Sequence, residues 1–463
     1  MEYRINSYIT AGSIISSLGF GTEENFSRIR EYRSGIARVE DTALFDTPFM
    51  AARIDDTRLK VLAQELDGYT RMEQLFILSL SDTIRQSGID PADPGCGLIL
   101  STTKGNIDGL AASRNEHSIT LAIDTQLRSQ SAPDYGRNRH PIGESATASS
   151  GLFGMAMRVA GYFGCVNEPI VISNACISGV SALIVASRLI EAGKYKHILV
   201  AGGDLLTRFV VTGFQSFKSV SPEICKPYDK TRDGLSLGEA CGSVLVTSDR
   251  GLVGEEQPVS IAGGSITNDA NHISGPSRTG DGLYYAISQA MDEAGLQQEA
   301  ISFVNAHGTA TLYNDEMESK ALHWAGLDHL PLNSMKSYWG HTLGASGIIE
   351  VIACMEELRS GEVFGTFGFE ACGVPYPLSV SAAHKKVAMA HCVKTASGFG
   401  GCNAAVVLSL EGESFDTPPA PSQEGKGYSR RTVVIERGKI VLDGEVLLET
   451  EPAGAFATFI RAA

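Results

Sequence analysis

The feature that most constrains the fold is a cysteine between a short apolar run and a longer stretch with helical spacing. Residues 169–173 (Pro-Ile-Val-Ile-Ser) have the composition of a short buried strand. Cys176 follows in a tight turn, and residues 180–192 place apolar side chains at the spacing of a buried helix. A strand that turns directly into a helix is typical of α/β folds. The sequence therefore predicts Cys176 at the N-terminus of a helix.

This position predicts that Cys176 is a nucleophile. The partial positive charge at a helix N-terminus favours thiolate over thiol, and the thiolate is the reactive form. The small residues Ala175, Ser178 and Gly179 let a substrate approach the sulfur. The competing interpretation is a buried cysteine that only packs, which is the usual role of an intracellular cysteine.

Strands and helices are predicted to alternate along the rest of the chain. Strands are expected at 8–18, 97–101, 196–201, 241–246, 260–267, 301–304, 387–392 and 404–410. Helices are expected at 23–32, 71–87, 282–294 and 347–358. This order favours mainly parallel sheets covered by helices, and its repetition indicates an internal duplication.

Three segments are predicted along the chain. Residues 1–250 form a first half with the candidate nucleophile, and residues 251–411 form a second half. Residues 412–463 form a Pro- and Gly-rich linker, to about residue 430, and a small β-rich tail. The tail has no catalytic pattern, so a packing appendage is the favoured interpretation.

Composition excludes several classes of protein. The net charge of -15 argues against general nucleic-acid binding. The first residues lack the apolar core of a signal peptide, and no run of apolar residues has the length of a membrane span. The nine cysteines form no CxxC pair, which favours reduced thiols in the cytoplasm over disulfides or a zinc site.

Polar side chains gather in a Gly-containing turn at residues 307–311 (His-Gly-Thr-Ala-Thr). A histidine at a strand end followed by glycine presents its imidazole at a pocket rim, although a lone His307 is more often structural. Asp315 and Glu318 follow and are placed to orient nearby basic groups.

Two further Gly-rich segments carry candidate functional residues. In residues 336–347, Lys336 and His341 flank a turn, and glycines then open a helix that contains Glu350. This turn matches neither the P-loop nor the GxGxxG pattern of phosphate binding. In residues 397–403 (Ser-Gly-Phe-Gly-Gly-Cys-Asn), glycines free backbone N–H groups to face a cavity, and the phenylalanine is a candidate lid.

In this order, the cysteine turn and the three clusters resemble the β-ketoacyl-acyl carrier protein synthases, the condensing enzymes of fatty acid and polyketide assembly. Residues 228–234 and 237–239 (Tyr-Asp-Lys-Thr-Arg-Asp-Gly and Leu-Gly-Glu) and residues 268–272 also resemble family segments. The resemblance covers residues 1–411 and implies a thiolase-like α/β fold, a duplicated five-layer α-β-α-β-α arrangement, with a small C-terminal β appendage beyond it. It also implies a homodimer, or a heterodimer with a related subunit.

The resemblance implies a role for each matching residue. Cys176 takes the acyl chain, while His307 and His341 hydrogen-bond the malonyl thioester carbonyl. Lys336 supports the second histidine, with Asp315, Glu318 and Glu350 as further supporting residues. The oxyanion hole and gatekeeper fall on Phe399 and Gly400.

The implied reaction is a decarboxylative Claisen condensation that gives β-ketoacyl-acyl carrier protein. Neutral imidazoles donate to the enolate oxygen as its charge forms, so no cofactor or metal is required. The partner is an acidic acyl carrier protein, for which Lys218 and, less strongly, Arg71 are the candidate docking residues.

Two alternatives remain. One is a non-catalytic partner subunit of the chain-length-factor type, although such subunits usually lack the nucleophile that Cys176 supplies. The other is a thiolase-type acyltransferase, because Cys402 lies near the position of a second thiolase cysteine. Ile177 stands where the family usually has alanine and is expected to reshape the acyl pocket. Cys402 and Cys241 are interpreted as packing changes.

Overall fold

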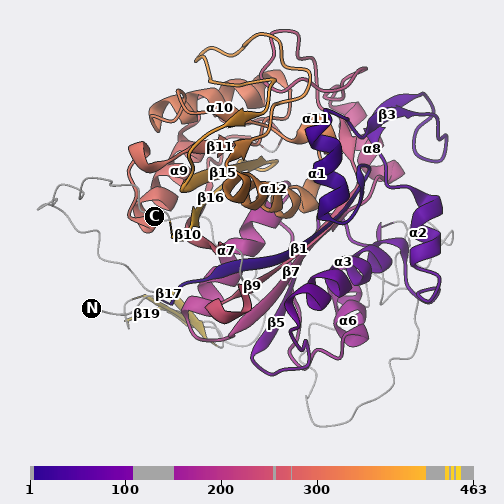
Figure 1. Cartoon of the computed structure of the whole chain (residues 1–463), viewed down its shortest axis with the longest axis vertical. Coiled ribbons are helices and arrows are strands. Elements are labelled where there is room, and N and C mark those ends of the chain that lie inside the picture. Colours follow the sequence, from indigo (N-terminus) through magenta and orange to yellow (C-terminus); the bar gives the residue numbers. More distant parts are fainter. Residues whose placement is uncertain are drawn as a thin grey trace, which may run out of the picture. The chain divides into compact units, whose positions relative to one another are not determined.

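Strand order repeats between the two halves of one large sheet (Figure 1). The computed structural model describes residues 5–107, 151–253, 257–272 and 274–412, and three short strands beyond them. The chain divides into two units, residues 1–416 and 417–463. The linker expected after residue 412 lies outside the described residues.

The first half of the sheet has the order β6-β5-β7-β9-β1 and the second has the order β12-β11-β15-β16-β10. The strands of the first half are β1 (Tyr8–Ser16), β5 (Cys96–Ser101), β6 (Ile170–Ile172), β7 (His197–Asp204) and β9 (Ala240–Thr247). Those of the second are β10 (Val259–Asn268), β11 (Phe303–Asn305), β12 (Leu332–Asn333), β15 (His391–Gly398) and β16 (Cys402–Leu410).

The pairings in the two halves correspond strand by strand. In each half the two outer ladders are parallel and the two inner ladders are antiparallel. Even the irregularities match, because β1 shifts register between Thr10 and Gly12 and β10 shifts between Ile261 and Gly263. The halves join through a short ladder in which Tyr8 and Ile9 pair with β10. The predicted duplication is confirmed.

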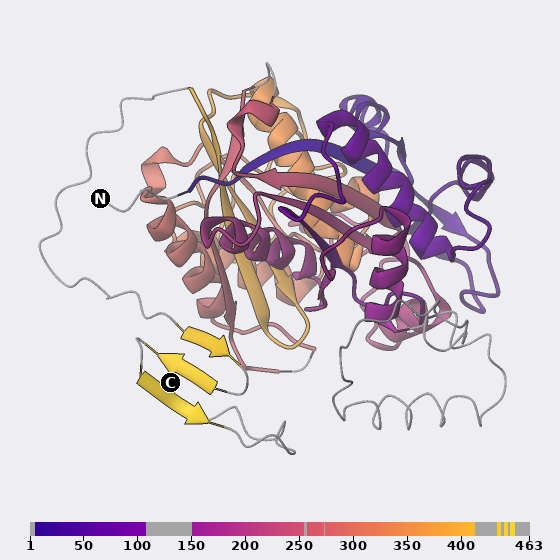
Figure 2. The same cartoon turned by 90° about the horizontal axis from the view of Figure 1, so that it is seen from below.

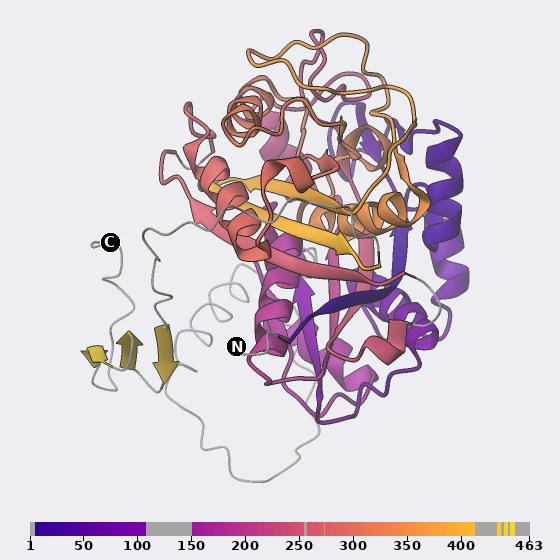
Figure 3. The same ribbon diagram turned by 60° about the vertical axis from the view of Figure 1, so that its left-hand side comes forward.

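Helices form three layers around the two half-sheets (Figures 1 and 3). In the middle layer, α7 (Ser178–Glu191) and α12 (Ser346–Ser360) pack against each other and against strands of both halves. The outer layers hold α3 (Arg71–Ser87) with α6 (Leu152–Tyr162) on one side, and α9 (Asp281–Ala294) with α10 (Leu312–Trp324) on the other. The predicted five-layer arrangement is confirmed.

Shorter elements complete the first unit. They are α1 (Thr22–Arg30), α2 (Asp56–Leu62), α8 (Arg208–Ser216), α11 (Lys336–Trp339), β2 (Gly19–Phe20), β3 (Ile36–Val39), β4 (Phe49–Ala52), β8 (Leu237–Gly238), β13 (Glu362–Val363) and β14 (Lys385–Lys386), with 3-10 turns at Arg250–Val253, Gln298–Ala300 and Leu343–Ala345. None of the described helices combines the length and the apolar character that a membrane-crossing segment needs.

The residues at the two ends of α3 explain why this helix has the bounds that the apolar pattern predicts. Thr70 and Glu73 form a capping box at the start of α3, and Gly88 ends it in the left-handed conformation. Its apolar face, which includes Leu75, Phe76 and Leu80, is fully buried in the core. The predicted bounds of 71–87 are therefore confirmed.

The prediction of a strand at 387–392 was wrong in its bounds. Strand β15 begins at His391 and continues to Gly398. The polar pair Lys394-Thr395 interrupts the apolar pattern, yet both side chains are fully buried. Hydrogen bonding to β16 along the whole length of β15 decides the strand here, because backbone pairing does not depend on side-chain polarity.

The second unit contains a small β-meander, as predicted for the tail. Strands β17 (Val433–Glu436), β18 (Lys439–Leu442) and β19 (Glu445–Glu449) pair in sequence order, each antiparallel to the next (yellow in Figure 2).

A contact between two glycines sets the distance between the central helices. Gly179 and Gly347 are the second residues of α7 and α12. A Cβ atom on Gly347 would lie 2.3 Å from the backbone nitrogen of Val180, and a Cβ on Gly179 would lie 2.8 Å from that of Ile348. The helices approach so closely because neither position carries a side chain. The two helix N-termini are thereby held together.

Candidate active site

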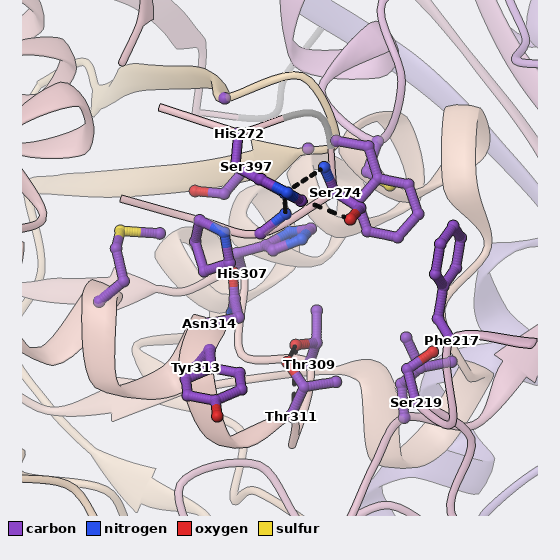
Figure 4. Close-up of a pocket in the computed structure, with 18 of the residues that line it drawn as sticks. Phe217, Ser219, His272, Ser274, His307, Thr309, Thr311, Tyr313, Asn314 and Ser397 are labelled. Carbon is purple, nitrogen blue, oxygen red and sulfur yellow. Dashed lines mark hydrogen bonds between the residues drawn. The ribbon is translucent and has the colours of Figure 1, made fainter. Parts of the chain in front are cut away.

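The carboxyl ends of strands from both halves converge on one cavity. Cys176 follows β6, His307 follows β11, His341 precedes α12, and Phe399 follows β15. All four line a cavity of about 330 Å³. Figure 4 shows His307 near its centre, with Thr309 and Thr311 below it and Phe217 to the right. Three of these segments lie more than 130 residues from Cys176, so only the fold brings them to the sulfur.

Cys176 lies at the start of α7, as predicted, in a strained turn. Ala175 has a φ of 44°, and the Ser178 hydroxyl donates to the Ala175 carbonyl at 2.6 Å while accepting from the Asn174 N–H at 2.8 Å. The Cys176 side chain is buried.

The expected depression of the Cys176 pKa was wrong. Burial raises the pKa of this thiol to about 12, and Asp204 acts in the same direction. The cations of Lys336 and Lys104 and a backbone hydrogen bond from Phe399 oppose the shift but do not outweigh it. The desolvation cost of a buried anion exceeds the effect of the helix N-terminus. At neutral pH the resting group is therefore the thiol.

The two predicted histidines lie side by side. The centroids of the His307 and His341 rings are 5.2 Å apart, and the ring planes are nearly perpendicular at 85°. Burial, followed by the charge of Lys336, holds the pKa of both imidazoles well below the usual value. Both rings are therefore neutral at pH 7. The Ser346 hydroxyl contacts Nδ1 of His341 at 3.2 Å, which leaves Nε2 for a ligand.

The downstream carboxylates act on backbone groups rather than on basic side chains. Glu318 accepts from the N–H groups of His307 and Gly308, both at 2.8 Å, and from the hydroxyls of Tyr228 and Thr395, both at 2.6 Å. Asp315 accepts from the backbone of Tyr228 and Thr309. Arg232 lies 3.7 Å from Asp315, so the expected pairing with a basic group is present but secondary.

The segment at residues 228–239 forms the support of the second histidine. Its strand β8 pairs with His341, whose N–H donates to Ser236 at 2.7 Å and whose carbonyl accepts from Gly238 at 3.0 Å. Tyr228, at the other end of the segment, ties it to Glu318. The segment therefore links the supports of both imidazoles.

Lys336 belongs to a buried ionic cluster that the sequence only partly predicted. Its ammonium nitrogen lies 2.6 Å from Oε1 of Glu350. The other carboxylate oxygen, Oε2, lies 2.8 Å from Nζ of Lys394. Sequence reasoning missed Lys394 because a lysine inside a strand is usually exposed.

Phe399 lies at the entrance of the cavity, with part of its ring exposed. The ring stacks on Phe214 at 5.5 Å and meets the edge of Phe217 at 5.4 Å. The preceding residue, Gly398, lies against the turn of the nucleophile, since a Cβ on Gly398 would lie 3.0 Å from the Cys176 backbone nitrogen. Gly400 is not among the residues that line the cavity.

The two predicted docking residues differ in environment. Lys218 is exposed directly after Phe217, which lines the cavity. The guanidinium of Arg71 instead contacts both oxygens of the buried Glu239 at 2.9 Å and Asp56 at 2.9 Å. Arg71 therefore links α3 to Glu239 and has little capacity left for a partner.

The residues at which this chain departs from the usual family pattern do not line the cavity. Ile177 is fully buried in the core and does not line the cavity. The expectation that Ile177 reshapes the pocket finds no support in the lining of this cavity. Cys402 is also absent from the lining and accepts from Asn268 at 3.4 Å, which argues against a thiolase-type second cysteine. Cys241 is buried in the core on the α3 side.

Asp204, at the end of β7, was missed by the sequence analysis. It accepts from Thr102 at 3.0 Å, from Thr103 at 2.9 Å and from Gly344 at 2.7 Å. It thus ties two strand ends of the first half to the turn before α12. No sequence pattern marks it, because its donors are mainly backbone groups. Among the described residues, no group of three His, Cys, Asp or Glu side chains is placed to hold a metal ion.

Comparison with known proteins gives two family matches. The model described as the N-terminal domain of β-ketoacyl synthase matches residues 8–250, and its C-terminal counterpart matches residues 259–370. The "putative polyketide beta-ketoacyl synthase 1" of Streptomyces halstedii is 29% identical over 427 residues, which cover 87% of this chain and 97% of that protein.

A second relative and a solved structure agree with this result. The "3-oxoacyl-acyl-carrier-protein synthase 2" of Vibrio cholerae is 26% identical over 421 residues, covering 86% of this chain and 98% of that protein. The structure of "the ishigamide ketosynthase/chain length factor" superposes with a TM-score of 0.74 at 25% identity, covering 89% of this chain and 100% of that chain.

Proposed function

Because the chain belongs to the β-ketoacyl synthase family, we propose that it condenses a malonyl-acyl carrier protein with an acyl chain held on Cys176. Carbon dioxide is lost, and the product is a β-ketoacyl-acyl carrier protein of fatty acid or polyketide synthesis. The observation that carries this proposal is the cavity in which the Cys176 thiol and two neutral imidazoles meet.

The first half-reaction loads the acyl chain. The Cys176 sulfur attacks the carbonyl carbon of the incoming thioester, and the backbone N–H groups of Cys176 and Phe399 donate to the oxygen as it becomes negative. The carrier thiolate leaves and takes the proton that the Cys176 thiol gives up. The aromatic contacts of Phe399 with Phe214 of α8 and with Phe217, which follows this helix, support a gate at this entrance.

The second half-reaction forms the nucleophile. The bond between the malonyl α-carbon and its carboxylate breaks, and the electron pair becomes an enolate whose oxygen accepts from His307 and His341. Neutral rings suit this role, because each keeps a ring N–H to donate. The α-carbon then attacks the acyl carbonyl carbon on Cys176, the bond from that carbon to sulfur breaks, and the departing thiolate takes a proton from solvent to regenerate the thiol. Lys336 and Glu350 form a buried ion pair close to the two imidazole rings.

Separate measurement of the two half-reactions tests this assignment. His307→Ala and His341→Ala should each lower malonyl decarboxylation by about 10²–10³, the effect of losing one oxyanion-type donor. Acyl loading of Cys176, followed by mass spectrometry, should remain detectable. His391→Ala is the matched control, because His391 lies outside the cavity and contacts Ser409 instead. Undiminished decarboxylation in both cavity variants would refute the enolate role.

The carrier protein is expected to dock beside the entrance. Lys218 is exposed there and forms no ion pair with the described residues, so it can meet an acidic partner despite the net charge of -15. Lys218→Glu should raise the KM for the carrier protein with little change in kcat. Lys60→Glu, at an exposed lysine of α2, should leave KM unchanged. An unmoved KM in Lys218→Glu would remove this assignment.

A second copy of the chain, or a related subunit, is the proposed partner at the edge of the sheet. Strand β6 ends the sheet, and its side chains are half-buried. Exposed Phe153, Met157 and Tyr162 of α6 and nearby Val166 extend this apolar surface. Edge strands with apolar neighbours favour association. Light scattering should give a dimer that Val166→Glu weakens, and an unaltered monomer in both would contradict this.

We place the enzyme in the cytoplasm. The nine cysteines are all free of disulfide bonds, and eight of the nine are buried or half-buried. Free thiols in this number favour a reducing compartment.

A further inference from the structure

Lys394 is a fully buried cation in the middle of β15. Its ammonium donates to the carbonyl of Thr395 at 2.7 Å and to that of Ala306 at 3.5 Å, and forms an ion pair with Glu350 at 2.8 Å. A buried ammonium is costly unless its charge is compensated.

The charges around Lys394 explain its presence. Two ammonium groups, Lys336 and Lys394, share one carboxylate, Glu350. Glu318 supplies a second buried carboxylate, whose oxygens accept from two backbone N–H groups and two hydroxyls. Burial raises the pKa of Glu357 to about 8, so this neighbour is mainly neutral at pH 7. The two ammonium groups and the two carboxylates together carry no net charge.

Other titratable groups surround this set. They are the neutral imidazoles of His307 and His341, the thiol of Cys354 on α12, whose pKa burial raises, and Asp315, whose pKa burial raises to about 7 and which lies beside Arg232. Apart from the Asp315–Arg232 pair, none of them adds a net charge at pH 7. Without Lys394 the cluster behind the histidines would be negative.

We propose that Lys394 is a positioning residue for the decarboxylation half-reaction. Its positive charge cancels the negative charge of the second buried carboxylate, Glu318, so that the enolate forms next to a group of side chains with no net charge. This inference rests on the proposed condensation. A negative cluster would oppose the new charge on the enolate oxygen and would favour protonated rings. Acyl loading places no lasting charge at the histidines, so it should not depend on Lys394.

Charge swaps test this directly. Lys394→Met keeps most of the length of the side chain and removes its charge. It should lower malonyl decarboxylation about tenfold or more, with acyl loading of Cys176 unchanged. The acid limb of the decarboxylation pH profile should move to higher pH, because the imidazoles lose a nearby cation that disfavours their protonation. Val393→Ala is the control, since it removes volume from the same strand without changing charge.

The decisive variant is the double substitution Lys394→Met with Glu350→Gln. It leaves Lys336 opposite Glu318 and restores the balance, so decarboxylation should recover and the acid limb should return towards the wild type. A purely structural role for Lys394 predicts a further loss instead. If Lys394→Met does not fold, the double variant is compared with the wild type directly.

Each outcome decides the matter. Full decarboxylation in Lys394→Met, or a loss that Glu350→Gln fails to reverse, overturns the inference. If wild-type protein loads an acyl chain but releases no carbon dioxide from malonyl carrier protein, the proposed condensation fails, not the role of Lys394 alone.

Discussion

The contact between Gly179 and Gly347 predicts the effect of a single added methyl group. In Gly347→Ala, the new Cβ would lie 2.3 Å from the Val180 nitrogen and 2.7 Å from the Gly179 carbonyl carbon. Ordinary contact begins near 3.4 Å, so the two helices must separate by about 1 Å. Both opposing atoms are backbone, and no rotamer change can relieve the overlap.

Stability and activity should both fall. Overpacking of this kind costs about 1–3 kcal/mol of unfolding free energy. Because α7 directly follows the turn that holds Cys176, and α12 follows His341, the separation also displaces the sulfur from an imidazole. A misplacement of about 1 Å costs on the order of 100-fold in rate. Urea unfolding and single-turnover condensation would measure the two effects.

The control is the same substitution where space is open. Gly213 lies within α8, and no atom comes within 4 Å of an added Cβ. Gly213→Ala should be neutral or more stable by about 0.5–1 kcal/mol. Wild-type stability and turnover in Gly347→Ala would refute the view that these glycines set the geometry of the site.

Three further results are expected. Iodoacetamide labelling of Cys176, corrected with Cys176→Ser, should keep rising up to about pH 10, since its pKa is raised to about 12; a plateau near pH 7 would contradict this. Glu357 keeps its proton up to about pH 8 in the folded state but releases it near pH 4.5 in the unfolded state, so the fold loses stability as the pH rises between these values. In Glu357→Gln, the free energy of unfolding measured with urea should fall less steeply over this pH range than in the wild type. The pKa of Asp229 is lowered to about 2, because hydrogen bonds from Ala371, Thr231 and Glu370 outweigh its burial. Asp229 therefore stabilises the fold above its unfolded pKa of 3.8, and this contribution is lost as the pH falls towards 2. Asp229→Ala should cost about 1–3 kcal/mol of unfolding free energy at pH 7, and an unchanged midpoint of urea unfolding would count against it.

Much of the site was predictable because its residues occupy local motifs. Apolar periodicity predicts α3 with correct bounds, and a strand-turn-helix pattern places Cys176 at the start of α7. The Gly-containing turns mark His307, His341 and Phe399 as side chains at element ends. These features depend on neighbours within a few residues, so the sequence expresses them directly.

Charge states were not predictable in the same way. The helix N-terminus suggests a reactive thiolate at Cys176, yet burial raises its pKa instead. Lys394 interrupts an apolar pattern and suggests a strand end, yet it lies buried inside β15 against Glu350. Desolvation and ion pairing depend on groups brought in from distant elements, and a linear sequence does not contain those distances.

The amino-acid sequence by itself determined the alternation of strands and helices, the duplicated halves and the identity of the reactive side chains, because each follows from local periodicity or a short motif. Only the tertiary structure decided that Gly179 meets Gly347, that two imidazoles lie 5.2 Å apart beside one thiol, and that Lys336 and Lys394 share a carboxylate. These contacts join segments of both halves, and packing of the central helices fixes their spacing.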